Sequence, residues 1–373
     1  MAPKEGKGAA RAEASATSPR ISILSSPSWS SRIGTRRSLA RLRPLTLATP
    51  ELVKLHTPTT LRTGVLPSEL ACRLFYYMAG DAKFWPRNTY YLFDKLVTSP
   101  HRTTFFVRSL QEGRGNSADM TSYNGKVVHE PKEFPWLLEE ACRVIEPIVL
   151  EEMQKRRRYP LEWGGHPAWT ASVAAVNCYE GMKEGVGYHA DALTYLGPHC
   201  TIASLSLGCE RRFRLRETLS PDPVREPRTF DIPLPHNSLL IMHPLTQERF
   251  KHSIPPQTRL DVFRPPLPAL PGGDTRAYNQ RINITFRFYR PDFCDLAPNC
   301  ACGLPAILRP DLKGKYAGRM DPDDEYQYFW QCDAGKVNEG KGCGLWQLMD
   351  WKAEKRGPML CEETRTCRND APC

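Results

Sequence analysis

Three side chains that can bind a metal ion are candidates for a single site. His189 and Asp191 lie two residues apart, and His252 lies much further along the chain. In an extended strand, residues i and i+2 point to the same side, so His189 and Asp191 could hold one ion together. With His252 from a neighbouring strand they would form the two-histidine, one-carboxylate set that is typical of non-haem Fe(II) oxygenases. The H-x-D tripeptide is common by chance, so other features must support it.

A second candidate is a strand with two arginines on one face. Residues 281–289 alternate polar and apolar side chains, which predicts a strand with an apolar face in a core. The polar face carries Arg281, Asn283, Thr285 and Arg287. Because guanidinium groups pair bidentately with carboxylates, an inward polar face would suit a dicarboxylate. On an edge strand the same face would contact water.

Two further segments supply polar groups in the same region. Asn177 and Tyr179 share one face of a short strand upstream of His189, and the glycines at 181, 185 and 187 permit a turn between this strand and His189. Gln247 precedes His252 and follows an apolar strand over residues 238–242. Strands are also expected at residues 201–207 and 212–215, and many short strands of this kind indicate a sandwich or barrel.

In order and spacing, these segments resemble the AlkB family of Fe(II)- and 2-oxoglutarate-dependent dioxygenases. The matching pieces are residues 177–179, 189–191, 196–198, 202–208, 212–213, 247 with 252, and 281–287. The resemblance covers residues 171–290, and residues 61–170 match the family's N-terminal, substrate-recognition part more loosely.

The resemblance implies an α+β fold whose core is a double-stranded β-helix, or jelly roll. It implies a catalytic Fe(II) ion held by His189, Asp191 and His252, with 2-oxoglutarate chelating the ion and reacting with O₂. The residues implied to hold the co-substrate are Asn177, Tyr179, Arg281, Asn283, Thr285 and Arg287. Arg281 is expected at the distal carboxylate and Arg287 near the metal-bound end, and the sequence leaves open how the two divide this work.

The family chemistry implied for this chain is oxidative demethylation of N-alkylated nucleobases in DNA, with single strands favoured. The alkyl carbon would leave as formaldehyde while 2-oxoglutarate is decarboxylated to succinate. The target base must leave the stack, and Tyr123, Trp85, Phe105 and Tyr188 are aromatic candidates to hold it. The alternatives are an RNA demethylase, a protein-directed oxygenase, and a nucleic-acid-binding protein with a silent oxygenase core.

Composition favours a nucleic-acid partner. The chain has a formal net charge of +10 and a pI of about 9.0, which favours binding to polyanions. No run of eighteen apolar residues predicts a membrane span, and we expect a monomer without membrane contact. Residues 1–55 are basic and acid-poor, which predicts a disordered arm. A nuclear protein is expected, with a mitochondrial transit peptide as the alternative.

Four cysteines near the C-terminus predict a second metal site. Cys300, Cys302, Cys332 and Cys343 could form a closed tetrahedral Zn(II) site. The flanking residues resemble a GRF-type zinc finger, although the tripeptide at 318–320 reads Gly-Arg-Met. Such fingers bind single-stranded nucleic acid, which implies contacts from Arg319 with Trp330, Trp346 or Trp351. Tyr123 is the further candidate for a nucleic-acid contact. Cys361, Cys367 and Cys373 have no assigned role.

The expected domains follow from these patterns: an arm at 1–55, a dioxygenase at 56–293 with its core at 171–290, a zinc finger at 298–355 and a flexible tail at 356–373. A helix is expected from an N-cap at Ser68 to Met78, and another over 134–154. The basic run 155–158 is either a solvated helix end or a phosphate contact.

Overall fold

The computed structural model describes most of the chain after Leu42. The described residues are 43–109, 122–123, 126–127, 132–218, 225–269, 272–273, 275–294, 297–312 and 326–359. They belong to one compact unit, Leu42–Cys373. The tail from residue 360 onward and the arm up to Leu42 lie outside the described residues.

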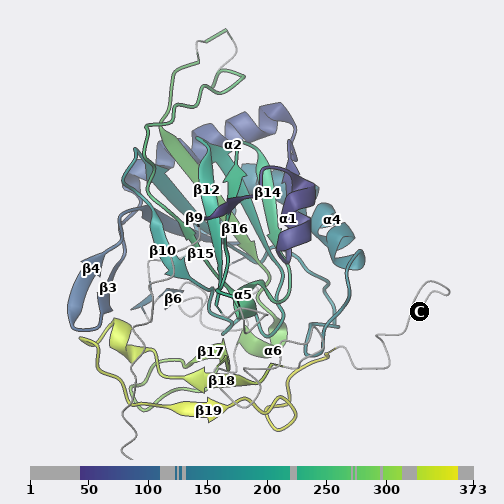
Figure 1. Ribbon diagram of the computed structural model, residues 1–373, viewed down its shortest axis with the longest axis vertical. Helices are drawn as coiled ribbons and strands as arrows, with labels where there is room; N and C mark the ends of the chain where they lie inside the picture. The colour runs from purple at the N-terminus through teal and green to yellow at the C-terminus, as the bar shows by residue number, and fades with distance from the viewer. Residues whose placement is uncertain are drawn as a thin grey trace, which may run out of the picture. The chain divides into compact units, whose positions relative to one another are not determined.

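Two largely antiparallel β-sheets form the centre of this unit (Figure 1). The seven-stranded sheet has the order β2 (Thr59–Thr63), β14 (Ser238–Met242), β11 (Ile202–Gly208), β16 (Gln280–Arg287), β9 (Val173–Glu180), β5 (Arg102–Val107) and β8 (Lys132–Glu133). The five-stranded sheet has the order β1 (Leu45–Thr46), β13 (Thr229–Leu234), β12 (Arg211–Glu217), β15 (Phe250–Ile254) and β10 (Val186–His189).

The two sheets share a buried core. Tyr179 and Leu240 of the large sheet pack in one cluster with Phe213, Phe230 and other residues of the small sheet. Side chains on β12 alternate between buried and more exposed, as a strand with one inward face requires. The fold is thus a sheet-rich α+β jelly roll, as expected from the sequence.

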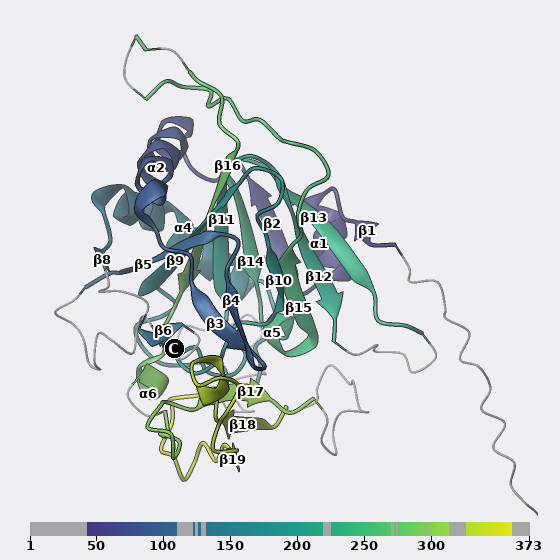
Figure 2. The same ribbon diagram turned by 90° about the vertical axis from the view of Figure 1, so that its left-hand side faces the viewer.

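Two amphipathic helices cover the outer face of the large sheet (Figures 1 and 2). Helix α4 (Trp136–Gln154) matches the predicted helix, and its buried side chains pack with those of α2 (Ser68–Asp81). The predicted N-cap at Ser68 is wrong, because Ser68 is the first helical residue and Pro67 occupies the cap position without a side-chain hydrogen bond. A short 3-10 helix, η1 (Ala82–Phe84), ends the α2 segment.

The prediction of disorder up to residue 55 is wrong from residue 45 onward. Strand β1 pairs in parallel with β13, and helix α1 (Pro50–His56) follows it. Thr49 caps the helix by accepting a hydrogen bond from the Leu52 amide, and Pro50 has the fixed φ that suits the first turn. Leu47 and Val53 are fully buried, so this segment contributes to the core between the sheets.

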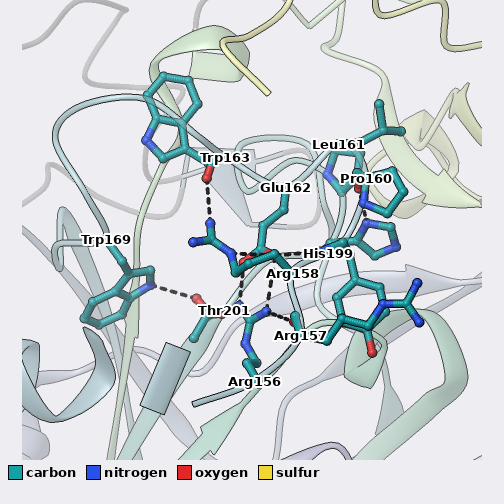
Figure 3. A network of polar contacts seen from close by, with 12 residues as sticks. Arg156, Arg157, Arg158, Pro160, Leu161, Glu162, Trp163, Trp169, His199 and Thr201 are labelled. Atoms are coloured by element: carbon teal, nitrogen blue, oxygen red, sulfur yellow. Dashed lines mark hydrogen bonds and ion pairs between the residues drawn. The ribbon is translucent and has the colours of Figure 1, made fainter. Parts of the chain in front are cut away.

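The basic run after α4 forms internal ion pairs rather than a free cationic patch (Figure 3). Arg156 and Arg158 both pair with the buried carboxylate of Glu162, which also accepts a hydrogen bond from the Tyr159 amide. Burial alone would raise the pKa of Glu162, but the two guanidinium groups hold it below its usual value. Both predictions for the basic run, a solvated helix end and a phosphate contact, are therefore wrong for Arg156 and Arg158.

The C-terminal residues form a small sheet that packs on the jelly roll. Its strands are β17 (Ile307–Pro310), β18 (Tyr328–Gln331) and β19 (Trp346–Leu348), with a 3-10 turn η2 (Ala334–Lys336). Leu308 and Trp330 share a buried cluster with Leu193 and with Phe293 of helix α6 (Pro291–Cys294). The separate finger expected at 298–355 therefore shares a core with the oxygenase residues.

Two hairpins and a short helix complete the described elements. These are β3 (Thr89–Leu92) with β4 (Lys95–Thr98), β6 (Ser122–Tyr123) with β7 (Lys126–Val127), and α5 (Thr246–Arg249). The β3–β4 hairpin contacts the C-terminal sheet, since the Phe93 carbonyl lies against Gly340. Among the described helices, none is both long and apolar enough to cross a membrane.

Substitution of Leu47 tests whether residues 43–56 are part of the fold. We expect Leu47→Ala to lower the free energy of unfolding by about 2–5 kcal/mol, because it leaves a cavity at a fully buried position. Leu55→Ala in the same segment is the control, since Leu55 is 74% exposed. Urea denaturation measures both, and equal small effects would show that the segment is not packed.

Candidate metal centre and co-substrate pocket

The jelly roll brings the three predicted metal ligands together. Strands β10 and β15 are antiparallel neighbours, and His189 lies directly opposite His252. Asp191 follows β10, and its Oδ1 lies 3.9 Å from His189 Nε2 and 3.7 Å from His252 Nε2. One ligand atom from each of the three residues lies within 4.8 Å of the others. The set of two imidazoles and one carboxylate is suited to Fe(II) with open coordination positions.

Hydrogen bonds orient the ligand atoms toward one point. His189 Nδ1 lies 2.9 Å from the Gly187 carbonyl, which can only accept, so Nδ1 carries the proton and Nε2 keeps a lone pair. Arg287 donates from Nε and Nη2 to Asp191 Oδ2, at 3.0 and 2.7 Å, which leaves Oδ1 on the histidine side. Gln247 Oε1 accepts from the Asp191 amide at 2.8 Å. Such outer contacts fix ligand orientation.

The electrostatics favour the protonation states that metal binding needs. Burial would raise the pKa of Asp191, but the neighbouring Arg287 and the two histidines hold it well below its usual range. Burial, with a smaller contribution from His189, lowers the pKa of His252 to about 3. At neutral pH the carboxylate is therefore ionised and His252 is neutral, as metal ligands must be.

A buried guanidinium group without a counter-ion lies deeper in the jelly roll. Arg281 is fully buried, and its Nε and Nη1 have no hydrogen-bond partner among the described residues. Its Nη2 donates to Ser206 Oγ at 2.9 Å, and the guanidinium lies 5.4 Å from the Tyr179 ring centroid. Because an unpaired buried charge is costly, this group fits a carboxylate ligand.

The other candidate co-substrate residues line the same interior face. Strand β16 places Arg281 opposite Tyr179 and Asn283 opposite Asn177 of β9. Asn283 Nδ2 donates to Ser204 Oγ at 2.8 Å. Thr285, the next residue on this face, is buried, while the apolar alternation Ile282, Ile284, Phe286 packs against the helices. The polar face is thus internal, and the wet edge-strand alternative is wrong because β16 has neighbours on both sides.

The structure distinguishes the roles of Arg281 and Arg287, which the sequence left open. Arg287 is bonded to the metal-ligand carboxylate of Asp191, whereas Arg281 has open donors away from the metal ligands. The distal carboxylate of a bound diacid would therefore meet Arg281.

The sequence assigned no role in this site to two residues that the structure places there. His101 stacks on Tyr179 with ring centroids 4.9 Å apart, and burial lowers the pKa of His101 to about 4. Phe213 stacks on His252 with centroids 5.3 Å apart. His101 carries no motif, so only the pairing of β5 with β9 reveals its place. Phe213 had a signal, because strand alternation on β12 predicts an inward side chain.

The structure revises the aromatic residues proposed to contact nucleic acid. Trp330 is fully buried against Phe293 and the Arg356 guanidinium, so its expected surface role is wrong. Trp85 is also buried, and it donates to Asp81. Tyr188, beside His189, is exposed.

Four further residues bear on nucleic-acid contacts: Phe93 is a new candidate, Phe105 is a predicted one, and the predictions for Arg319 and Tyr123 are not tested by the structure. Phe93 is 81% exposed at the tip of the β3–β4 hairpin, where its φ is +59°, and it was missed because a Leu-Phe pair is typical of a core. Phe105 is half-buried on β5. Arg319 and the side chain of Tyr123 lie outside the described residues.

The four C-terminal cysteines also converge. The sulfur atoms of Cys300, Cys302, Cys332 and Cys343 lie within 4.8 Å of one another, with 4.0 Å between those of Cys302 and Cys332. A backbone hydrogen bond from Leu345 and the neighbouring thiols lower the pKa of Cys343 to about 6. Four converging sulfur atoms fit a closed tetrahedral ion.

Comparison with known proteins gives a family match over most of the jelly roll. The family model described as the 2OG-Fe(II) oxygenase superfamily matches residues 60–287. Alpha-ketoglutarate-dependent dioxygenase alkB homolog 3 of Homo sapiens is 33% identical over 119 residues, which are 31% of this chain and 36% of that protein. DNA oxidative demethylase ALKBH2 of Homo sapiens is 31% identical over 120 residues, or 32% and 40% of the two chains.

The matched segment spans little more than a third of the length of these relatives. A solved structure, that of OsALKBH1, covers 62% of this chain and 99% of its own, with 13% sequence identity and a TM-score of 0.38.

Removal of the Arg287 guanidinium tests how the carboxylate ligand is held. We expect Arg287→Met to weaken Fe(II) binding about ten- to hundredfold, because Asp191 Oδ2 loses both hydrogen bonds that orient it. Anaerobic calorimetric titration measures the affinity. Arg214→Met is the matched control, since Arg214 makes a similar two-point pair with Asp231 in the small sheet. Equal affinities of both variants would contradict this role.

Proposed function

We propose that this chain, which belongs to the 2OG-Fe(II) oxygenase superfamily, is an oxidative demethylase of N-alkylated nucleobases. It carries an Fe(II)/2-oxoglutarate dioxygenase domain with AlkB-family homologues. The preferred substrate of the proposed reaction is alkylated single-stranded DNA. Relatives named as a DNA oxidative demethylase and an alkB homolog support this substrate class, as does the net charge of +10.

The observation that carries the proposal is the combination of two sites in one barrel. A metal-ligand triad and a buried guanidinium with open donors lie on the inner faces of facing sheets. Bound Fe(II), with 2-oxoglutarate and O₂, supplies the oxidising chemistry at the alkyl carbon. The chain's own residues hold its parts: Arg287 orients Asp191, and Arg281 binds the distal carboxylate.

Aromatic side chains around the site are proposed to hold the extruded base. Tyr188 precedes the metal ligand His189 and is exposed, with the Arg216 guanidinium 5.9 Å from its ring. Phe93 on the β3–β4 hairpin offers an exposed ring on which a base could stack. Each of these rings can contact a base without sequence preference.

The C-terminal sheet is proposed to be a GRF-type zinc finger within residues 298–355, with Zn(II) bound by Cys300, Cys302, Cys332 and Cys343. The exposed partner that replaces Trp330 is Trp346, which is 54% exposed and stacks on Phe329 at 5.2 Å. A stacked pair on an open strand is suited to single-stranded nucleic acid. A monomer in the nucleus, with mitochondria as the alternative, remains our proposal for state and location.

The direct test is demethylation of defined oligonucleotides. Wild-type protein with Fe(II), ascorbate and 2-oxoglutarate should remove methyl groups from N-methylated single-stranded DNA, followed by mass spectrometry of the bases. His189→Ala should abolish turnover, and His166→Ala, at an exposed histidine outside the triad, should not. Turnover of methylated RNA alone would support the RNA demethylase instead. No methyl loss from either polymer would rule out the proposal.

A cysteine variant tests the zinc site. Cys332→Ser should reduce bound zinc from about one ion per chain to nearly none and weaken binding to single-stranded DNA, because a structural site needs all four ligands. It should also lower the melting temperature of the whole unit, since the sheet shares a core with Leu193 beside Asp191. Cys294→Ser, outside the cluster, is the control. Unchanged zinc content, measured by elemental analysis, would refute the site.

A further inference from the structure

A second buried arginine lies in the interior near Arg281. Arg211 begins strand β12 and is almost fully buried. Its Nη2 donates to the Gly181 carbonyl, but its Nε and Nη1 have no hydrogen-bond partner among the described residues. This guanidinium is therefore held at one corner while two donors remain unused.

The strand directs Arg211 into the space between the sheets. Arg211, Phe213 and Leu215 are the buried positions of β12, and Phe213 stacks on the metal-ligand ring of His252. Arg212, between the first two, points outward with 66% of its side chain exposed. Arg211 thus lies on the inner face of the small sheet, one inward position beyond the residue that contacts His252.

The connection between sheets brings Arg211 toward Arg281. Gly208 at the end of β11 is paired with Arg281, and the next residue, Cys209, donates its amide to the Gln280 carbonyl at 2.9 Å. Arg211 follows two residues later. Arg211 Nη2 donates to the carbonyl of Gly181, which lies two residues beyond Tyr179, and Tyr179 pairs with Arg281. The two guanidinium groups therefore lie in the same part of the interior, and the charge of Arg211 adds to burial in lowering the pKa of Arg281 to about 10.

No carboxylate of the described residues neutralises this pair. Neither arginine has an ion-pair partner among them, and the acids nearest to Arg211 are engaged elsewhere. Glu184 pairs with Arg87, and Asp261 accepts hydrogen bonds from the amides of Glu210 and Val262. Two buried positive charges with four unused nitrogen donors destabilise the empty interior, and a bound anion would offset this cost.

We propose that Arg211 binds the co-substrate directly, forming with Arg281 a two-guanidinium pocket for the distal carboxylate of a 2-oxo dicarboxylate. This inference rests on the proposed function and deepens it, since it names the group that selects a diacid over a monoacid. The carboxylate has two oxygens, and each guanidinium offers two unused donors to them.

The test compares Arg211→Gln with Arg212→Gln, an adjacent arginine that faces outward. Anaerobic calorimetry on the Fe(II)-loaded protein measures binding of 2-oxoglutarate and of 2-oxobutyrate, which lacks the distal carboxylate. We expect Arg211→Gln to weaken 2-oxoglutarate binding about ten- to hundredfold, the value of one charge-assisted hydrogen bond, and to leave 2-oxobutyrate binding unchanged. Arg212→Gln should change neither, and Arg211→Lys should restore part of the affinity.

Two more readouts separate direct binding from a purely structural role. In Arg211→Gln the KM for 2-oxoglutarate should rise more than kcat falls. The melting temperature without ligand should not fall, because an uncompensated charge is removed, while the added stability from 2-oxoglutarate should shrink. A lower ligand-free melting temperature with parallel weakening of both acids would assign Arg211 only to holding the Gly181 turn, and overturn the inference.

Failure of this inference is distinct from failure of the proposed function. If wild-type protein does not bind 2-oxoglutarate at all, the proposed function itself fails. If wild-type protein binds it and Arg211→Gln binds it equally well, only the role of Arg211 is wrong.

Discussion

The ion pair between Arg287 and Asp191 joins the two sheets where the candidate metal ligands meet. Arg287 belongs to β16 of the large sheet, while Asp191 follows β10 of the small one. The two hydrogen bonds occupy one carboxylate oxygen and turn the other toward the histidines, which face each other on neighbouring strands. A buried ion pair is stable only with good geometry and satisfied polar atoms. Here two hydrogen bonds satisfy Oδ2 of Asp191, and Oδ1 is left to face the histidines. The orientation of the Asp191 carboxylate therefore depends on this pair, which also links the two sheets across their shared core.

The same strand carries the second constraint, which is uncompensated positive charge. Strand β16 is flanked by β11 and β9, yet every second side chain on it is polar and faces inward. Such an arrangement would destabilise a simple sandwich, since buried guanidinium groups need partners. Its persistence at Arg281 indicates an interior organised around an anionic ligand. The C-terminal sheet is also connected to this site. Tyr328 donates a hydrogen bond to Glu248 in the short helix α5, which leads into the strand that carries His252.

The sequence was most informative where a period of two coincides with unusual polarity. Residues 281–287 identified the inner face of the large sheet, and the H-x-D tripeptide identified that of the small sheet. This was possible because the alternation along a strand decides which side chains point to the same face. Contacts between distant segments could not be obtained in this way. The burial of Leu47 depends on β13, and the pairing of Arg156 with Glu162 depends on how the chain turns after α4.

Trp330 is a similar case on the C-terminal sheet. Alternation on β18 predicts that Tyr328 and Trp330 share one face, but only the packing against Phe293 shows that this face is the buried one. In each of these cases tertiary packing, rather than local pattern, determines the environment of the residue.

We propose that His189, Asp191 and His252 hold one ion and that a bound diacid reaches from this ion to Arg281. Crystals grown anaerobically with Fe(II) and 2-oxoglutarate, measured at the iron absorption edge, test it directly. We expect an anomalous peak bonded to all three side chains, with ligand density that ends on the Arg281 guanidinium. An iron peak elsewhere, or a diacid that leaves Arg281 without a partner, would contradict it.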